Sequence, residues 1–225
     1  LSFWIKANGK RILFDTGQGD ALPQNAKRLG IDLQSTDILV LSHGHYDHTG
    51  GIPSVTAQAK YLKIFCHPEA ICPKYCQKQN TINPIGIPHQ SKESLSKIHP
   101  DALHWVQNPV LLTKSIGLSG TIPRLATFEG GNGNFFLDPD RKHIDPIEDD
   151  LDLLISTKDG LVIVVGCAHA GLINTINYIV KTTKIKQIKA IIGGFHLLES
   201  EEYCLNQTMV ALRELNPTKV IPCHC

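Results

Sequence analysis

Apolar residues in this chain recur in short runs of strand length, separated by polar turns and by segments with helical spacing. Strands are expected at residues 1–6, 11–15, 37–42, 63–67, 151–157, 161–166, 188–194 and 219–224. Helices are expected at residues 20–29, from Thr49 onward, and at 91–100, 171–183 and 200–215. Alternation of strands and helices is typical of the α/β class, in which helices cover the faces of a sheet.

Two hairpins are indicated by their turn residues. Asn8 and Gly9 stand between the first two predicted strands, and this dipeptide is typical of a hairpin turn. The residues at 158–160 separate two further apolar runs in the same way. Both pairs of strands are therefore expected to be antiparallel.

Periodicity weakens between about residues 70 and 130, where prolines recur and only one segment has helical spacing. Such a stretch is typical of an insertion that covers a functional face. We therefore expect one domain over 1–225 with an insertion or lid at about 70–130. Because the chain begins at Leu1 within a predicted strand and stops just after His224, we expect a domain trimmed at both ends.

The composition gives no electrostatic reason for binding nucleic acid or an anionic membrane. Of the 225 residues, 42% are hydrophobic and 19% are charged, and the formal net charge is +1. No apolar run approaches the roughly 20 residues that a membrane-spanning helix requires. We therefore expect a small-molecule substrate, with neither nucleic acid nor a membrane as partner, and the oligomeric state stays open.

The chain has seven cysteines, an odd number without the spacing of a small disulfide scaffold. This usage indicates a reducing compartment, so a cytoplasmic protein is expected. Cys66, Cys72 and Cys76 cluster beside His67, but their spacing fits no common zinc pattern. Partly buried, unpaired thiols are the favoured interpretation, with a metal knuckle as the alternative.

Residues 43–48, His-Gly-His-Tyr-Asp-His, place three histidines and an aspartate directly after a predicted buried strand. Imidazole and carboxylate groups are costly to desolvate, so four of them at this point require a common partner. His43 and His45, two apart in an extended turn, can face one ion. Asp47 and His48 can face a second one. A metal site is favoured over the alternative of a solvated polar loop. Imidazole and carboxylate donors suit zinc, with manganese or iron as alternatives.

Three further histidines also follow apolar strands: His169, His196 and His224. Loops at the carboxyl ends of strands converge on ligands, so these histidines and the first cluster point to one shared site. His169 and His224 are favoured as metal ligands over hydrogen-bonded histidines at the edge of the core. For His196 three roles stay open: metal ligand, substrate contact, or hydrogen-bond partner of a ligand. Asp47 and His196 are the catalytic candidates.

The segments Phe-Asp-Thr-Gly at 14–17 and Ser-His-Gly-His-Tyr-Asp-His-Thr-Gly-Gly at 42–51 resemble the metallo-beta-lactamase superfamily. The stretches at 148–178, 191–197 and 222–225 are similar to one branch of it. That branch contains the 7,8-dihydropterin-6-methyl-4-(beta-D-ribofuranosyl)aminobenzene 5'-phosphate synthases of methanopterin biosynthesis and related metal-dependent hydrolases. Fold and metal site are shared across many chemistries in this superfamily, so the resemblance alone does not select a reaction.

The resemblance implies an αββα sandwich of the metallo-beta-lactamase type, with a binuclear metal site along one edge. By motif, one ion would be held by His43, His45 and His169, and the other by Asp47, His48 and His224. Asp15 would be buried behind the ligands and tie the first hairpin to the metal loop. Most superfamily members carry an aspartate that bridges the metals, whereas here the corresponding strand ends in Gly-Cys-Ala-His. Cys167 would then bridge or support the metals, or His169 would be the only contribution of this loop.

Two divalent ions close together lower the pKa of a shared water and hold the oxygens of a phosphoryl or acyl group. The leading hypothesis is a binuclear hydrolase that acts on a phosphorylated or pterin-like small molecule through a metal-bound hydroxide oriented by Asp47. The alternative is a transferase of the methanopterin pathway that condenses a dihydropterin diphosphate with ribosylaminobenzene phosphate. A non-hydrolytic metal-binding or redox protein on the same fold is a third hypothesis.

Three residues of the predicted lid are candidate substrate contacts: His89, Ser91 and Arg124. Arg124 is the best phosphate candidate, because a guanidinium group binds phosphate in a bidentate fork. An ordinary surface arginine is the alternative interpretation.

Overall fold

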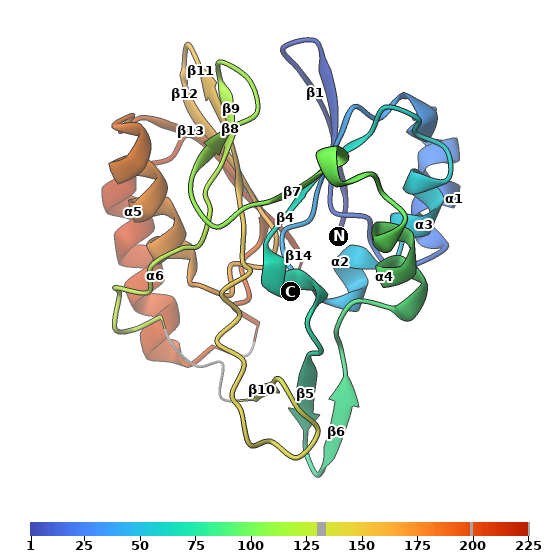
Figure 1. The fold of residues 1–225 in the computed structure, drawn as a ribbon. Helices are drawn as coiled ribbons and strands as arrows, with labels where there is room; N and C mark the ends of the chain where they lie inside the picture. The colour runs from blue at the N-terminus through green and yellow to red at the C-terminus, as the bar shows by residue number, and fades with distance from the viewer. Residues whose placement is uncertain (130–133, 199, 225) are drawn as a thin grey trace. The chain divides into compact units, whose positions relative to one another are not determined.

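Two compact units make up the computed structural model, which describes residues 1–129, 134–198 and 200–224 (Figure 1). The first unit consists of Leu1–Gln107 and Asn132–Asp149, and the second of Asn108–Gly131 and Asp150–Cys225. Each unit contains a mixed sheet with helices packed against it and an apolar core of its own. The α/β class expected from the sequence is thereby confirmed.

The main sheet of the first unit begins with the predicted hairpin, whose turn residues Asn8 and Gly9 both have positive φ (50° and 69°). β1 (Phe3–Ala7) pairs antiparallel with β2 (Lys10–Phe14). The parallel strands that extend the sheet are β3 (Ile38–Val40), β4 (Lys63–Cys66) and β7 (Leu103–Trp105). The strand order β1-β2-β3-β4-β7 places the loops after β2, β3 and β4 at one edge of the sheet.

Short helices cover this sheet with apolar side chains. Their bounds are Ala21–Arg28 for α1, Tyr46–Thr49 for α2, Ile52–Thr56 for α3 and His89–Ser96 for α4. Turns of 3₁₀-helix occupy Leu33–Ser35, Pro68–Ile71 and Pro100–Ala102. The core joins Leu22 of α1 and Val55 of α3 to Leu39 of β3. Because each helix has at most eight residues, its stability depends on this packing.

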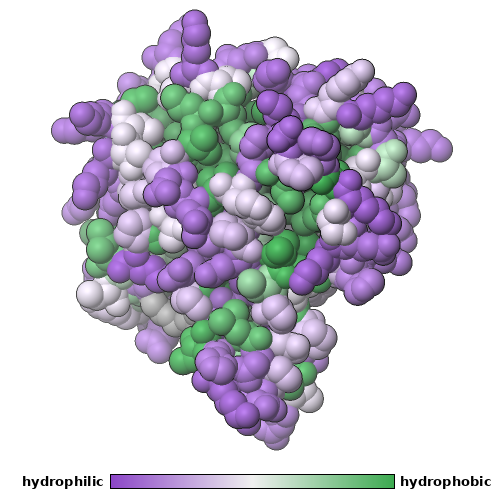
Figure 2. All heavy atoms as spheres, viewed as in Figure 1, coloured by the Kyte–Doolittle hydropathy of each residue, from purple (hydrophilic) through white to green (hydrophobic). Residues whose placement is uncertain are grey.

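A smaller sheet in the first unit has the order β10-β5-β6. Its strands are β5 (Tyr75–Lys78), β6 (Thr81–Pro84) and β10 (Phe135–Phe136). The β5–β6 hairpin is drawn at the bottom of Figure 1, and hydrophilic side chains cover its tip in Figure 2. β5 joins the hairpin to the rest of the unit through its pairing with β10.

The second unit has a sheet of order β14-β13-β12-β11-β9-β8. Its strands are β8 (Val110–Leu111), β9 (Ile116–Leu118), β11 (Leu153–Thr157), β12 (Gly160–Val165), β13 (Ile188–Gly194) and β14 (Val220–His224). β12, β13 and β14 are parallel, and the remaining pairs are antiparallel. α5 (Leu172–Thr183) packs Ile176 and Ile179 into this core, and α6 (Glu202–Leu215) adds Leu212.

The stretch from 70 to 130 contributes strands to three sheets. β7 belongs to the main sheet of the first unit, and β8 and β9 belong to the sheet of the second. The expected insertion at about 70–130 is therefore not one continuous segment outside the two main sheets, and its β5–β6 hairpin lies in the small sheet with β10. Strands of two or three residues are too short to produce a visible alternation, and neighbouring prolines obscure them further.

The cysteine-rich stretch forms no disulfide among Cys66, Cys72 and Cys76 in the described chain. Burial raises the pKa of the Cys66 thiol to about 12, so this side chain packs as a small apolar group. None of the helices within the described ranges combines the length and apolar character that crossing a membrane requires.

Candidate metal centre

The histidine loop, residues 42–48, follows β3 and leads into α2, which begins directly after His45. Hydrogen bonds from His48 and Thr49 to the carbonyl oxygen of His45 close this first turn. The backbone N–H of His48 donates to the carbonyl of His45 at 3.0 Å, and the hydroxyl of Thr49 donates to it at 2.8 Å. α2 therefore ends at Thr49, where a helix was expected to begin, and includes His48; the next helix, α3, begins at Ile52.

Asp15 is a fully buried carboxylate after β2 that binds the histidine loop. One oxygen accepts from the backbone N–H of Ser42 at 2.7 Å. The other accepts from the Ser42 hydroxyl and from Nδ1 of His48, each at 2.7 Å. Because the carboxylate accepts, a neutral His48 carries its proton on Nδ1 and its lone pair on Nε2. A carboxylate behind a histidine is the usual arrangement for a ligand that binds metal through Nε2.

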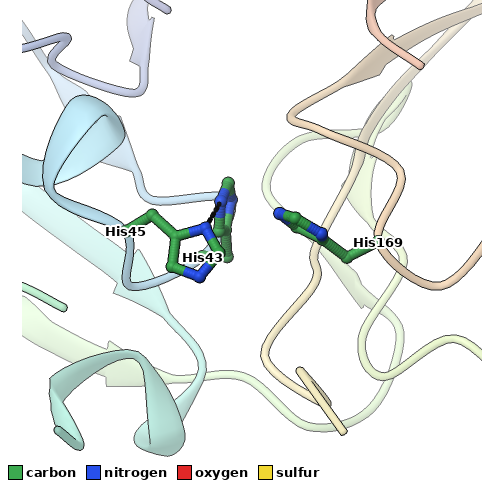
Figure 3. Close-up of side chains that lie close together, drawn as sticks. All are labelled: His43, His45 and His169. Atoms are coloured by element: carbon green, nitrogen blue, oxygen red, sulfur yellow. Dashed lines mark hydrogen bonds between the residues drawn. The ribbon is translucent and has the colours of Figure 1, made fainter. Parts of the chain in front are cut away.

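His43 and His45 turn ring nitrogens toward each other, as the dashed line in Figure 3 marks. Nε2 of His43 lies 2.9 Å from Nδ1 of His45. Nδ1 of His43 lies 2.8 Å from the Ser42 hydroxyl. With the hydroxyl proton of Ser42 directed at Asp15, His43 donates from Nδ1 and keeps the lone pair on Nε2. Two converging imidazole nitrogens, both from buried residues, fit the donor chemistry of a divalent metal ion.

The electrostatics of His45 also suit a metal ligand. Burial lowers its pKa to about 3, against the opposing charge of Asp149. His45 is therefore neutral near pH 7, as ligation through a ring nitrogen requires. Its ring also lies against Phe135, with the ring centroids 5.6 Å apart, which restricts its orientation.

Asp47 and His48 form a second pair of donors next to the first. Oδ2 of Asp47 lies 3.5 Å from Nε2 of His48, and the side chain of Asp47 is 30% exposed. The ring of His48 lies beside that of His43, with 4.1 Å between their centroids. The first unit therefore places all four residues of the predicted cluster together, as two adjacent pairs.

Two residues that hold the histidine loop were not identified from the sequence. Oδ2 of Asp149 accepts from the backbone N–H of Gly44 at 2.7 Å, and Lys74 binds the other oxygen of this carboxylate at 2.8 Å. The acidic run Glu-Asp-Asp at 148–150, just before a predicted strand, was the available signal for Asp149. Lys74 offered none, because a single lysine is normally exposed.

In the second unit the predicted residues lie at the carboxyl ends of β12, β13 and β14. Cys167 and His169 are buried in the loop after β12. His196 is exposed in the loop after β13, and its ring centroid lies 4.6 Å from that of His169. Figure 3 draws the His169 side chain. His224 ends β14. The sequence correctly places these residues at strand ends.

The loop that carries His169 is held within its own unit. A buried carboxylate oxygen of Asp150 accepts from the backbone N–H of Ala170 at 2.7 Å. Nη1 of Arg124 donates to the carbonyl oxygen of His169. Glu129 accepts from two backbone N–H groups in the first turn of α5, each at 2.7 Å. Burial raises the pKa of Glu129 despite these bonds. Arg124 thus contacts the backbone of a predicted ligand.

The other two lid candidates differ in their surroundings. His89 is exposed at the start of α4. Ser91 is fully buried, and its hydroxyl donates to the carbonyl of Thr49 at 2.8 Å. The expected substrate contact of Ser91 is therefore corrected to a link between α4 and the end of α2.

Gly44 has no room for a side chain, so its replacement by alanine is expected to destabilise the protein. An added Cβ would lie 2.2 Å from the carbonyl oxygen of Ala70, and backbone cannot move as cheaply as a side chain. Overpacking of this kind costs about 1–3 kcal/mol or more of unfolding free energy. Denaturant unfolding measures it, with Lys92→Ala as the control, because Lys92 is an exposed residue of α4. Equal stability of Gly44→Ala and wild type would contradict the close packing.

Comparisons with known proteins agree over nearly the whole chain. A family model described as the metallo-beta-lactamase superfamily matches residues 1–224. A 7,8-dihydropterin-6-methyl-4-(beta-D-ribofuranosyl)-aminobenzene-5'-phosphate synthase of Methanocaldococcus jannaschii is 33% identical over 237 residues, which cover 100% of this chain and 80% of the synthase. A protein of the same organism described as uncharacterized, MJ0448, is 32% identical over 226 residues, or 100% of this chain and 82% of its own length.

Among solved structures, the crystal structure of Tm1679 is similar to this chain. It is described as a metal-dependent hydrolase of the beta-lactamase superfamily. The similarity has a TM-score of 0.78 at 30% sequence identity and covers 95% of this chain and 77% of Tm1679.

Proposed function

Because the chain belongs to the metallo-beta-lactamase superfamily, we propose that it is a binuclear metal-dependent hydrolase acting on a phosphorylated or pterin-like small molecule. The observation that carries this proposal is the convergence of His43 Nε2 and His45 Nδ1 at 2.9 Å, beside the pair of Asp47 and His48. Tm1679, similar along nearly the whole chain, is described as a metal-dependent hydrolase. The superfamily and its metal dependence support the class, and the substrate is our proposal.

The donor types favour a catalytic over a structural metal site. Structural zinc sites are usually rich in cysteine and closed, whereas the first unit offers imidazoles and one carboxylate that is partly exposed. The proposed ions are two divalent cations, preferably zinc, with manganese or iron as alternatives. From the motif resemblance, the proposed ligand sets are His43, His45 and His169 for one ion, and Asp47, His48 and His224 for the other.

The chain's own residues supply the rest of the chemistry. When bound, divalent ions in such a site polarise a phosphoryl oxygen and lower the pKa of a water molecule. Asp47, with a partly exposed carboxylate, is proposed to orient that water and accept its proton. Arg124, whose Nη1 donates to the carbonyl oxygen of His169, is proposed to bind a substrate phosphate, because a guanidinium group binds phosphate in a bidentate fork. His196, exposed next to His169, is proposed to contact the substrate.

A second candidate function is favoured by one specific observation. The synthase of Methanocaldococcus jannaschii is 33% identical to this chain along its full length. In a condensation of a dihydropterin diphosphate with ribosylaminobenzene phosphate, the same cations would stabilise the diphosphate leaving group. Such a transferase must exclude water from its electrophile, which a hydrolase must admit.

The two functions predict different dependence on the aromatic acceptor. Metal-loaded protein is incubated with the dihydropterin diphosphate, with and without ribosylaminobenzene phosphate, and separately with bis(p-nitrophenyl) phosphate. For a hydrolase we expect hydrolysis of the diphosphate or of the diester at the same rate with and without acceptor. Diphosphate release that requires the acceptor would instead support the transferase. Bound iron without turnover of any of these substrates would contradict both.

A further inference from the structure

Lys74 is a buried cation between two buried carboxylates of the first unit. Its Nζ donates to Oδ2 of Asp145 at 2.9 Å and to Oδ1 of Asp149 at 2.8 Å. The side chain of Lys74 is 1% exposed and both carboxylates are fully buried. Burial lowers the pKa of Lys74, but the charges of Asp149 and Asp145 outweigh it, so the pKa is raised and the ammonium stays charged.

The carboxylate of Asp149 links Lys74 to the histidine loop. Its second oxygen accepts from the backbone N–H of Gly44 at 2.7 Å, at the residue between the two converging histidines. Gly44 is also packed against the backbone of Ala70 so closely that no Cβ fits there. The peptide between His43 and His45 is thus held by one charged hydrogen bond and by one close backbone contact.

The backbone of Lys74 makes a second connection to the same loop. Its carbonyl accepts from the N–H groups of Ile85 at 2.8 Å and Gly86 at 3.2 Å, which close the base of the β5–β6 hairpin. The carbonyl of Ile85 in turn accepts from the N–H of Tyr46 at 2.9 Å, directly after His45. One lysine therefore joins the hairpin, the acidic loop before residue 150 and the histidine loop.

A buried ion pair is by itself weak evidence for stability, because desolvation of the charges offsets their attraction. The direction of the bonds indicates a more specific role. Each oxygen of Asp149 has a separate partner, Lys74 on one side and Gly44 on the other. Lys74 therefore fixes the carboxylate in the orientation that reaches the loop.

We propose that Lys74 is a positioning residue which, through Asp149 and the N–H of Gly44, sets the spacing of His43 and His45 and thereby the affinity for metal. The role toward metal rests on the proposed function, whereas the hold on the loop does not. Substitutions of buried groups that orient metal ligands typically weaken metal binding 10–100-fold.

The test uses Lys74→Met, with Leu33→Ala as a control that truncates a buried side chain in the core of the same unit. Two quantities are measured on folded protein: amide hydrogen exchange of residues 43–46 without metal, and zinc affinity by competition with a chromophoric chelator. In Lys74→Met we expect exchange about tenfold faster, as a charged hydrogen bond is weakened, and zinc affinity about 10–100-fold lower. Leu33→Ala should change neither quantity beyond its effect on global stability.

A second variant tests whether the effect comes from the lost hydrogen bond to Asp149 or from the changed net charge. It also serves if Lys74→Met alone folds poorly. Lys74→Met with Asp145→Asn removes one positive and one negative charge, so the net charge of the cluster is unchanged. We expect this double variant to keep the faster exchange and the weaker zinc binding. Wild-type values in it would overturn the proposal, as would equal changes in Leu33→Ala. A wild-type protein without zinc affinity would refute the proposed function, and the exchange measurement would still decide whether Lys74 holds the loop.

Discussion

Replacing His45 by alanine is expected to lower the zinc affinity of the protein by about 100-fold or more and to abolish turnover. Removing a group that only hydrogen-bonds to a metal ligand already lowers metal affinity about 10–100-fold. Removing the ligand itself is therefore expected to lower it at least as much. Nδ1 of His45 converges with Nε2 of His43 at 2.9 Å, and its imidazole is neutral near pH 7 because burial lowers its pKa to about 3. Without this nitrogen, one proposed ion loses a donor for which the loop offers no substitute at that position.

The fold should survive this substitution, because the backbone of His45 makes the structural contacts. Its carbonyl accepts from the N–H of His48 and from the hydroxyl of Thr49, and alanine keeps both bonds. Zinc content by elemental analysis, zinc affinity and phosphodiester hydrolysis measure the effect. His99→Ala is the control, since this histidine side chain is 75% exposed. Full zinc content in His45→Ala, with a wild-type unfolding transition, would contradict the assignment.

The parts of the fold that could be predicted from the sequence are those in which the local pattern carries the information. β3 is a continuous apolar run, and β13 is apolar or glycine apart from Lys189, because most of their side chains are buried. The histidines that follow both strands therefore lie at the carboxyl ends of the sheet strands. The hairpin at Asn8 formed as predicted because its turn requires two positive φ angles, which asparagine and glycine supply. The superfamily was recognised from such local motifs and is confirmed by the family match over residues 1–224.

The remaining features depend on partners far apart in sequence. Lys74 and Asp149 are 75 positions apart, and Gly44 and Asp149 are 105 apart, so no local pattern indicates either bond. Glu129 likewise binds the first turn of α5 across 44 positions. The strands that the sequence did not predict between 70 and 130 have two to four residues. They form because of their neighbours in the sheet rather than because of their own strand propensity.

Asp15 was identified from the sequence as a residue behind the ligands, and its bonds suggest how it acts. Its carboxylate accepts from the N–H and hydroxyl of Ser42 and from Nδ1 of His48, so every one of these groups is a donor. An asparagine has the same shape but places an NH₂ donor at one of the two oxygen positions. The N–H of Ser42 can still be satisfied by the amide oxygen, and the NH₂ group then faces His48.

Asp15→Asn is therefore expected to move the proton of His48 from Nδ1 to Nε2, the nitrogen that faces Asp47 at 3.5 Å. With its lone pair on Nδ1, His48 can no longer bind a metal through Nε2, and zinc affinity should fall about 10–100-fold. Asp15→Ala should additionally leave buried donors without acceptors, which costs about 1–3 kcal/mol of unfolding free energy for each.

Long-range ¹H–¹⁵N correlation spectra of the imidazole rings report the His48 tautomer directly, and competition with a chelator reports zinc affinity. Asp37→Asn is the control, because Asp37 is likewise an acceptor of a backbone N–H but pairs with Arg11 near the surface. An Asp15→Asn protein that keeps both the wild-type tautomer and the wild-type zinc affinity would show that Asp15 does not set the donor atom of His48. A changed tautomer with unchanged zinc affinity would instead remove His48 from the proposed ligand set, because a ligand bound through Nε2 cannot also carry its proton there.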